Sequence, residues 1–134
     1  MLVIAVETKI SDQTVKNYID KAAIARSTDR KNLEAREQFV NSRLALLSPD
    51  QKIEWAEKQA FLAIGILVSA AAEAGIDTSP MEGFDPNQVD EILSLKEQHL
   101  KSALLFALGY RSAEDEFATI PKVRKTREEL FSAF

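Results

Sequence analysis

The longest continuous pattern in the sequence is SPDQKIEWAEKQAFLAIGILVSAAAEAG, residues 48–75. Its opening serine suits a helix N-cap, the proline after it is tolerated in the first turn, and the glutamine three residues after the serine completes a capping box. The closing glycine is the residue that most often follows a helix. The pattern therefore predicts one long helix from residue 49 to about residue 74.

The two halves of this helix differ in composition. Residues 49–59 mix charged and apolar side chains, whereas residues 60–72 are apolar on every side. A helix that is apolar all round has to be buried all round. Two placements meet that condition: a central helix inside one monomer, or a core helix that also packs across a subunit interface. The small residues Ala63, Gly65, Ser69 and Ala70 would permit a close approach in the second case, and the sequence leaves both placements open.

The segments before the long helix follow strand and helix patterns in turn. Residues 2–7 are short, apolar and rich in β-branched side chains, which is typical of a buried strand. Ser11 can cap a helix that starts at Asp12. The polar residues 26–32 predict a loop, and an irregular apolar pattern over residues 33–47 predicts a second helix.

The segments after the long helix continue this alternation. Residues 76–84 predict an extended segment with a turn, and Asp85-Pro86 opens a short helix. The side chains expected to face inward from that helix are Val89, Ile92, Leu93 and Leu95. Residues 102–110 predict a second buried strand, and the polar tail ends in a helical turn. The alternation predicts an α/β or α+β layer structure in one domain, residues 1–134.

The composition disfavours several classes of protein. The chain has 134 residues, with 17 Lys and Arg against 21 Asp and Glu, so its net charge is −4. Nucleic-acid binders are basic, so we expect no nucleic-acid partner. Because Cys is absent and His occurs once, we expect no metal site. The apolar stretches are too short to cross a membrane and no secretory signal is visible, which predicts no membrane association and a cytoplasmic location.

Two segments suggest a binding site. Lys122 and Arg124 alternate, so on an extended chain both side chains face one side, which suits a phosphate group. The ordinary alternative is a solvated tail. In residues 80–84, Pro-Met-Glu-Gly-Phe, the glycine lets the backbone approach a flat ligand, and the ordinary alternative is a simple turn. The spacing alone favours the ordinary alternative for both segments. The single histidine, His99, is interpreted as structural.

Several motifs occur together in a fixed order. They are Ser79-Pro80-Met81-Glu82-Gly83-Phe84-Asp85, then Leu108-Gly109-Tyr110, then Ala118-Thr119-Ile120-Pro121-Lys122-Val123-Arg124, all preceded by a helix with Glu54-Trp55 and Lys58-Gln59. In this order and spacing they resemble the C-terminal half of the FMN-dependent nitroreductase family. The likeness is closest to the oxygen-insensitive NAD(P)H nitroreductase and dihydropteridine reductase branch. Each motif alone is a weak signal, but their joint occurrence is specific, and the resemblance extends from residue 2 onward.

The resemblance implies a fold and an activity. The fold would be α+β, a nitroreductase-like mixed sheet flanked by helices, with the long helix at the interface of a homodimer. FMN would lie at that interface. NAD(P)H would give a hydride to the flavin, and the reduced flavin would pass two electrons to a small-molecule acceptor such as a nitroaromatic or a quinone. The cofactor, rather than a catalytic side chain, would carry the chemistry.

The resemblance also implies roles for individual residues. Pro80 and Met81 would pack against the flavin ring, and backbone N–H groups around Glu82 and Gly83 would reach its N5 edge. The side chains that would bind the FMN phosphate are Lys122 and Arg124. A mobile helix that covers the substrate pocket would contain Phe39 and Val40.

The sequence departs from the family pattern near its start. The family has an N-terminal portion with an Arg-x-Ser cluster for the phosphate, a Pro-Ser-Ser segment from the partner subunit and one further strand. These features are not found in this sequence, and Arg26-Ser27-Thr28 only imitates the cluster. We therefore expect a truncated homologue with an incomplete nitroreductase-like domain. Two functions stay open: an FMN-dependent NAD(P)H oxidoreductase, or a non-catalytic remnant that only dimerises.

Overall fold

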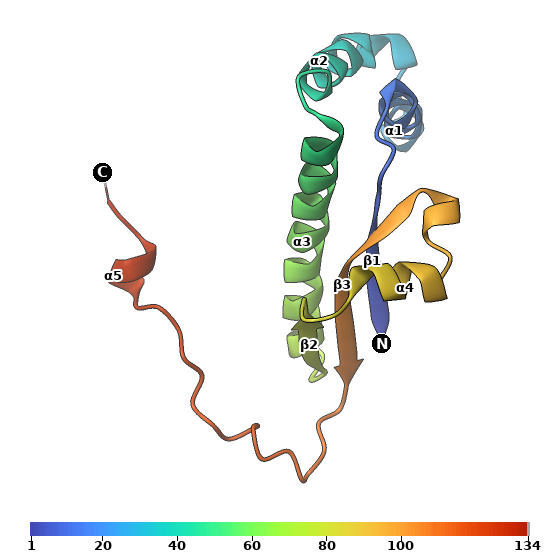
Figure 1. Ribbon diagram of the computed structural model, residues 1–134. Helices are drawn as coiled ribbons and strands as arrows, with labels where there is room; N and C mark the ends of the chain where they lie inside the picture. The colour runs from blue at the N-terminus through green and yellow to red at the C-terminus, as the bar shows by residue number, and fades with distance from the viewer. Residues whose placement is uncertain (134) are drawn as a thin grey trace.

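The computed structural model describes residues 1–133, and its elements follow the predicted order (Figure 1). The strand at residues 2–7, the helix from Asp12, the long helix and the strand near residues 102–110 are all confirmed. In chain order, the elements are β1 (Leu2–Glu7), α1 (Asp12–Ala25), η1 (Arg30–Leu33), α2 (Glu34–Leu44), α3 (Pro49–Glu73), β2 (Asp77–Met81), α4 (Pro86–Ile92), η2 (Lys96–Gln98), β3 (Leu100–Gly109) and α5 (Arg127–Leu130).

The long helix α3 begins and ends where its sequence signals predict. The backbone N–H of Gln51 donates to the Ser48 hydroxyl at 3.2 Å, and the Ser48 N–H donates to the Gln51 side chain at 2.9 Å. After the last helical residue, Glu73, the chain leaves through Gly75, whose φ of +69° is a conformation that glycine adopts at little cost. Within residues 1–133, neither α3 nor any other helix is long and apolar enough to span a membrane.

The three strands form one sheet in the order β1-β3-β2. Both strand pairs are antiparallel, so the prediction of a mixed sheet is wrong for the strands of residues 1–133. For β2 and β3, residues 82–99 return the chain to the end of the sheet where β2 finishes. Met81 therefore pairs with Leu105, and Asp77 pairs with Gly109 at the end of β3.

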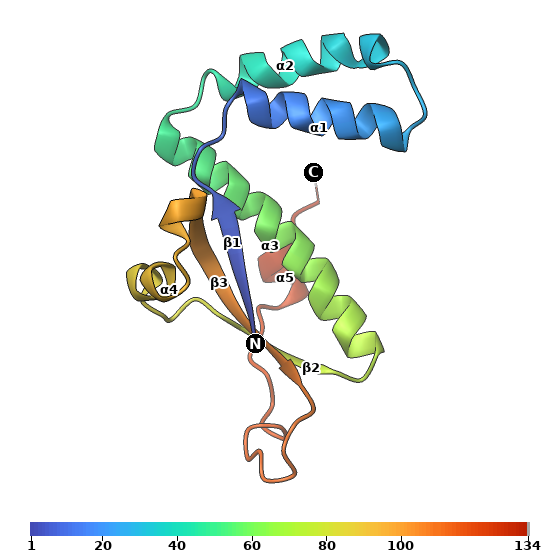
Figure 2. The same ribbon diagram turned by 90° about the vertical axis from the view of Figure 1, so that its right-hand side faces the viewer.

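One side of α3 packs on the sheet (Figure 2). Ile64 is 6% exposed and contacts a cluster that includes Leu104 and Phe106 of β3. The opposite side of α3 is open, with Leu62 67% and Ile66 73% exposed. This apolar surface lies outside the core, so residues 1–133 by themselves do not enclose α3 as the first of the two predicted placements requires.

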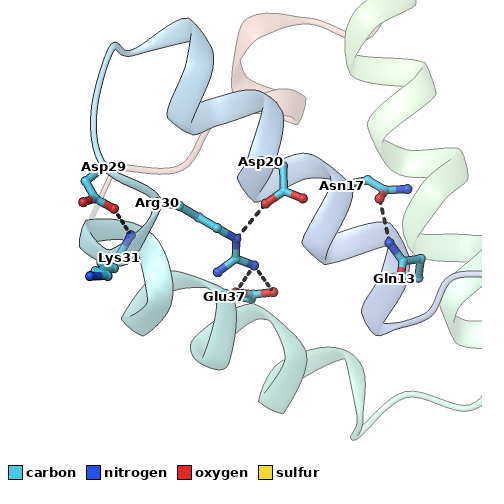
Figure 3. A network of polar contacts seen from close by, with 7 residues as sticks. All are labelled: Gln13, Asn17, Asp20, Asp29, Arg30, Lys31 and Glu37. Atoms are coloured by element: carbon cyan, nitrogen blue, oxygen red, sulfur yellow. Dashed lines mark hydrogen bonds and ion pairs between the residues drawn. The ribbon is translucent and has the colours of Figure 1, made fainter.

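The helices α1 and α2 form a hairpin at the N-terminal end of α3, away from the end where β2 lies (Figures 1 and 2). Residues 26–32, predicted to be a loop, include the start of the 3₁₀ turn η1. The Arg30 guanidinium of this turn donates to Asp20 of α1 at 2.7 Å and to Glu37 of α2 at 2.7 Å (Figure 3). These bonds tie the connecting segment to both helices.

Two side chains near α4 do not lie where the sequence predicts. Ile92 is 79% exposed, and Leu93 is also exposed, whereas Leu95 is buried as predicted. The inward position of this short helix is taken by Asp90 instead. Ile92 follows two residues later, about 200° further round the helix, so it points to solvent.

The chain after β3 forms an arm that leaves the body of the protein (Figure 1). Beyond Arg111, its described hydrogen bonds join residues of the arm to one another, such as the bond from the Lys122 ammonium to the Phe117 carbonyl at 3.0 Å. The arm ends in α5, where Thr126 caps the helix through the N–H of Glu129. The position of this arm therefore depends on its first residues, next to the sheet.

Candidate functional site

A hollow of about 570 Å³ lies where the start of β2 meets the end of β3. Its walls come from residues 77–79 of β2, residues 107–111 at the end of β3, and the loop residues Asp115, Phe117, Ala118 and Lys122. The hollow thus combines aromatic side chains, strand backbone and a lysine ammonium. This combination suits a ligand with a flat apolar part and an anionic group. Among the described residues, no group of three or more His, Cys, Asp and Glu side chains gathers to hold a metal ion.

An ion pair spans one rim of the hollow. The Arg111 guanidinium donates to both carboxylate oxygens of Asp77, at 2.5 and 2.6 Å. The hydrogen bond from Arg111 holds the pKa of Asp77 below its ordinary value. This paired geometry joins the first residue of β2 to the chain just after β3, so it fixes the point from which the arm departs.

The ion pair makes a small, pH-dependent contribution to stability. Because the pKa of Asp77 is lowered in the folded chain, the contribution is present above the unfolded pKa of about 4 and is lost as pH falls through the folded value. We expect Asp77→Asn to lower the urea midpoint slightly at pH 7 and to have a smaller effect at pH 2. The matched control is Glu114→Gln, an exposed carboxylate outside the described ion pairs. An equal Asp77→Asn effect at both pH values would contradict this expectation.

The four predicted ring-binding residues lie at the other end of β2. Pro80 pairs with Phe106, and Met81 pairs with Leu105. Because β2 is an edge strand, Pro80 can occupy it without leaving a neighbouring strand short of a hydrogen bond. Pro80 and Glu82 line a second hollow of about 440 Å³ against Phe61, Ile64 and Gly65 of α3 and Leu104 of β3. The two hollows thus have walls at consecutive residues of one strand, Ser79 and Pro80.

Gly83 lies in the turn after β2, where the Phe84 N–H donates to the Glu82 carbonyl at 2.9 Å. A Cβ atom added to Gly83 would meet no other atom within 4 Å, and its φ is outside the left-handed region. Gly109, in the wall of the first hollow, has equally open space. Neither backbone strain nor packing within the chain requires glycine at these two positions. Space next to the backbone is what a flat ligand would need.

Only one of the two predicted phosphate-binding residues lines the first hollow. Lys122 is part of its wall, whereas Arg124 is not, and its guanidinium donates to the neighbouring Val123 carbonyl at 2.8 Å. The chain is irregular here, so the extended-strand geometry that would turn both side chains to one side is not formed. The structure brings Lys122 to the start of β2 and leaves Arg124 further along the arm.

The predicted substrate-pocket residues lie at the far end of the molecule from β2. Phe39 is 61% exposed on α2, with the Arg43 guanidinium 5.6 Å from its ring centre, and Val40 packs on the core of the helical hairpin. The hairpin joins the N-terminal end of α3, and β2 follows its C-terminal end (Figure 2). Since a helix of 25 residues is about 37 Å long, one chain does not bring these residues near Pro80–Gly83.

Comparison with known proteins identifies the family of this chain. The model of the nitroreductase family matches residues 7–110. The chain therefore belongs to the nitroreductase family, and the sequence-based recognition is confirmed. The crystal structure of the YdfN protein of Bacillus subtilis has the same fold, with a TM-score of 0.80 and 20% identity over 98% of this chain and 62% of that one. The predicted fold class, α+β and nitroreductase-like, is confirmed as well.

Curated relatives match parts of the chain. The oxygen-insensitive NAD(P)H nitroreductase of Enterobacter cloacae is 34% identical over 93 residues, which cover 69% of this chain and 42% of that enzyme. The major NAD(P)H-flavin oxidoreductase of Aliivibrio fischeri is 32% identical over 98 residues, covering 70% of this chain and 45% of that enzyme. The chain thus spans less than half the length of these relatives in the matched region.

The sequence motifs already contained Leu108, Gly109, Tyr110 and Ala118 of the first hollow, but they did not reveal its ion pair. Asp77 and Arg111 are 34 positions apart, and neither stands in a motif that suggests a pair. Phe117 was visible only as an apolar residue in the polar tail. A signal could have come from the pairing of β2 with β3, because that register sets Asp77 opposite Gly109 and so near Arg111. The strand β2 itself was predicted only as an extended segment.

Proposed function

We propose that this chain forms the flavin-contacting part of an FMN-dependent NAD(P)H oxidoreductase of the nitroreductase type. The observation that carries the proposal is the placement of two hollows along β2, one walled by Lys122 and one by Pro80 and Glu82. The names of the relatives, NAD(P)H nitroreductase and NAD(P)H-flavin oxidoreductase, support the same activity. The acceptors proposed are nitroaromatics and quinones.

The residues on both sides of β2 fit FMN. When bound, FMN takes a hydride from NAD(P)H and passes two electrons to the acceptor. In the proposal, Lys122 and Arg124 hold the phosphate by charge-assisted hydrogen bonds. Pro80 and Met81 support the ring, and the turn at Gly83 presents backbone N–H groups to its edge. The open space at Gly83 and Gly109 supports this placement, because a ring can approach the backbone there.

The proposed enzyme is a homodimer. The open side of α3 presents Phe61, Leu62 and Ile66, which are large apolar residues, around Gly65. The one hydroxyl of this surface, on Ser69, donates to the Gly65 carbonyl at 3.0 Å, so it needs no water. A two-fold axis across this surface buries it against its own copy. We call this surface, residues 61, 62, 65, 66 and 69, the open face of α3.

The homodimer also explains the position of the substrate-pocket residues. If the two copies of α3 pack antiparallel, the hairpin of one copy lies near β2 of the other. The partner's Phe39 and the partner's Val40 would then cover the flavin that is held by the first copy. Each copy would supply the substrate-pocket residues for the flavin that the other copy holds, so the proposed site needs two chains.

The experiment that tests the proposal is an FMN titration of the purified chain. We expect the flavin fluorescence to be quenched on binding, and the loaded protein to oxidise NADPH with menadione as acceptor. Riboflavin is the matched control, because it has the same ring and lacks the phosphate, so it should bind more weakly. A chain that dimerises but binds neither flavin would support the alternative function of a non-catalytic dimerising domain.

Substitution of two glycines separates ligand contact from folding. Gly83→Ala is expected to leave the free energy of unfolding nearly unchanged, because no atom lies within 4 Å of the added Cβ. If FMN lies against this turn, overpacking lowers its affinity about tenfold. Gly75→Ala, at φ +69°, is expected to cost about 1 kcal/mol of stability and to leave FMN affinity unchanged. Urea melts and FMN titrations measure both quantities, and an unaffected Gly83→Ala affinity would argue against the placement.

A further inference from the structure

The turn after β2 is attached to the same strand at both of its ends. At the first end, Met81 is paired with Leu105 of β3. At the second end, the N–H of Ser102 in β3 donates to the Asp90 carboxylate of α4 at 2.8 Å. The two attachment points on β3 are only three positions apart. Residues 82–89 lie between these two attachments and therefore form an arch over β3. We call the two attachments, Met81 to Leu105 and Asp90 to Ser102, the feet of the arch.

A β-bulge in β3 turns Ser102 toward α4 at the second of these attachments. Ile4 pairs with Leu104 but Ala5 pairs with Ser102, so Ala103 has no partner across the strand. Alternate residues of a regular strand share a face, and Ser102 would then face α3 together with Leu104. The extra residue reverses this direction. As a result Leu104 packs on Ile64 of α3, while the Ser102 hydroxyl donates to the Pro86 carbonyl of α4 at 3.4 Å.

The contact between Asp90 and Ser102 is buried. Asp90 is 4% exposed and Ser102 is 2% exposed, and these are the buried polar residues of the described chain. A buried carboxylate costs stability unless it is hydrogen-bonded, and an apolar residue at such a position is often no less stable. Packing alone therefore gives no reason for an acid on the inward side of α4. The hydrogen bond that the Asp90 carboxylate accepts from the Ser102 N–H of β3 does give a reason for an acid at this position.

Two local groups of hydrogen bonds lie between these attachments. The Phe84 N–H donates to the Glu82 carbonyl at 2.9 Å, which closes the turn around Gly83. The Asp85 carboxylate accepts the N–H groups of Asn87 and Gln88, at 2.9 and 3.4 Å, and so caps α4. Each bond is local, so none decides where the arch stands on the sheet. That position is set by the feet.

We infer that Asp90 is a positioning residue for the flavin. Its carboxylate, bound to Ser102 at the bulge, sets the position of the arch whose backbone faces the flavin edge. This inference rests on the proposed function for its ligand, whereas the attachment itself belongs to the chain without a ligand. Asp90 touches no reacting atom, and it acts through residues 82–89.

The experiment compares Asp90→Asn with Ile19→Val in the full chain. Asn keeps the shape and one acceptor oxygen but loses the charge, which weakens the bond to Ser102. Ile19 lies in the core of the distant hairpin, so Ile19→Val supplies a loss of stability with no effect on the arch. Hydrogen–deuterium exchange of peptides that cover residues 82–89 is measured first, without ligand. We expect exchange there to rise about tenfold in Asp90→Asn and to stay unchanged in Ile19→Val.

The second measurement is FMN binding. We expect Asp90→Asn to lower the affinity about tenfold and to shift the visible absorption of the bound flavin, with no such change for Ile19→Val. If the unsubstituted chain binds no FMN, the proposed function fails. The exchange result still decides whether Asp90 holds residues 82–89 to β3. If Asp90→Asn does not fold, the exchange of the Ser102 amide in the unsubstituted chain decides it: protection equal to the strand-paired amides supports the tether. Fast exchange at Ser102, or equal exchange of residues 82–89 in both variants, overturns the inference.

Discussion

Replacing Lys122 and Arg124 together by alanine is expected to lower FMN affinity by roughly two orders of magnitude or more. Each side chain is proposed to give a charge-assisted hydrogen bond to the phosphate, and such bonds contribute about 1.5–3 kcal/mol apiece. Both side chains are exposed, and they lie on the arm outside the core, so the variant should fold normally. Fluorescence titration with FMN at one fixed salt concentration measures the loss.

Two comparisons make this expectation specific. Lys125→Ala removes a neighbouring cation that has no proposed role, so it should change FMN affinity by little. Riboflavin lacks the phosphate, so its affinity should not respond to the double substitution. If the FMN affinity of the double variant stays within about twofold of the unsubstituted chain, the arm does not bind FMN. The single Lys122→Ala variant should have the larger effect of the two single changes, because only Lys122 lines the hollow beside β2.

Substitutions at Ile64 and Ile66 are expected to change different properties: the stability of the chain for Ile64, and dimerisation for Ile66. Ile64 is 6% exposed in the core between α3 and β3, so Ile64→Ala should cost about 2–5 kcal/mol of stability in the chain. Ile66 is two residues further on, on the open face of α3, so Ile66→Glu should leave the fold of the chain intact. If the open face is the dimer interface, Ile66→Glu places two buried charges across the axis and yields a monomer.

The measurements for this pair are urea melts and sedimentation at several protein concentrations. Leu62→Glu is a second test of the open face, with the same expected result as Ile66→Glu. The matched control is Lys16→Glu, which changes the charge at an exposed position of α1 outside the open face and should leave the dimer intact. A stable dimer in both Leu62→Glu and Ile66→Glu would contradict the proposed interface. Ile64 does not test the interface, because its side chain is buried against β3.

The sequence predicted the elements whose signals are local. The capping box of Ser48 and Gln51, the proline after it and Gly75 lie within or beside the helix that they delimit, and α3 has the bounds that they indicate. Asp85 likewise caps α4 through its own neighbours. Such interactions depend on a few consecutive residues, so one sequence is enough to read them.

Relations between distant segments could not be read in the same way. The apolar run of α3 gave no helical phase, because every side is apolar, and so it did not show that Ile64 faces β3 while Ile66 faces outward. The bulge at Ala103 has no distinctive residue, and it is visible only when β1 and β3 are paired. The buried Asp90 looked like an ordinary surface acid, since its partner is a backbone N–H that twelve residues separate from it.

The candidate site shows the same division. The segment Pro80–Gly83 and the pair Lys122 and Arg124 were predicted from motifs, and the structure places Lys122 in one hollow beside β2 and Pro80 in another. The walls of those hollows, formed by Arg111, Phe117 and the end of β3, depend on how the sheet pairs. Their role in binding stays a prediction, as does the role of Phe39 and Val40.

The most direct test of the account is to follow the backbone amide signals of the isotopically labelled chain by NMR while FMN is added. The central claim is that one flavin lies along β2 between the turn at Gly83 and the arm at Lys122. We predict saturable shifts at the non-proline residues of 77–83, 107–111 and 117–124. Saturable shifts that avoid β2 and the arm, or no shifts at all, would contradict the claim.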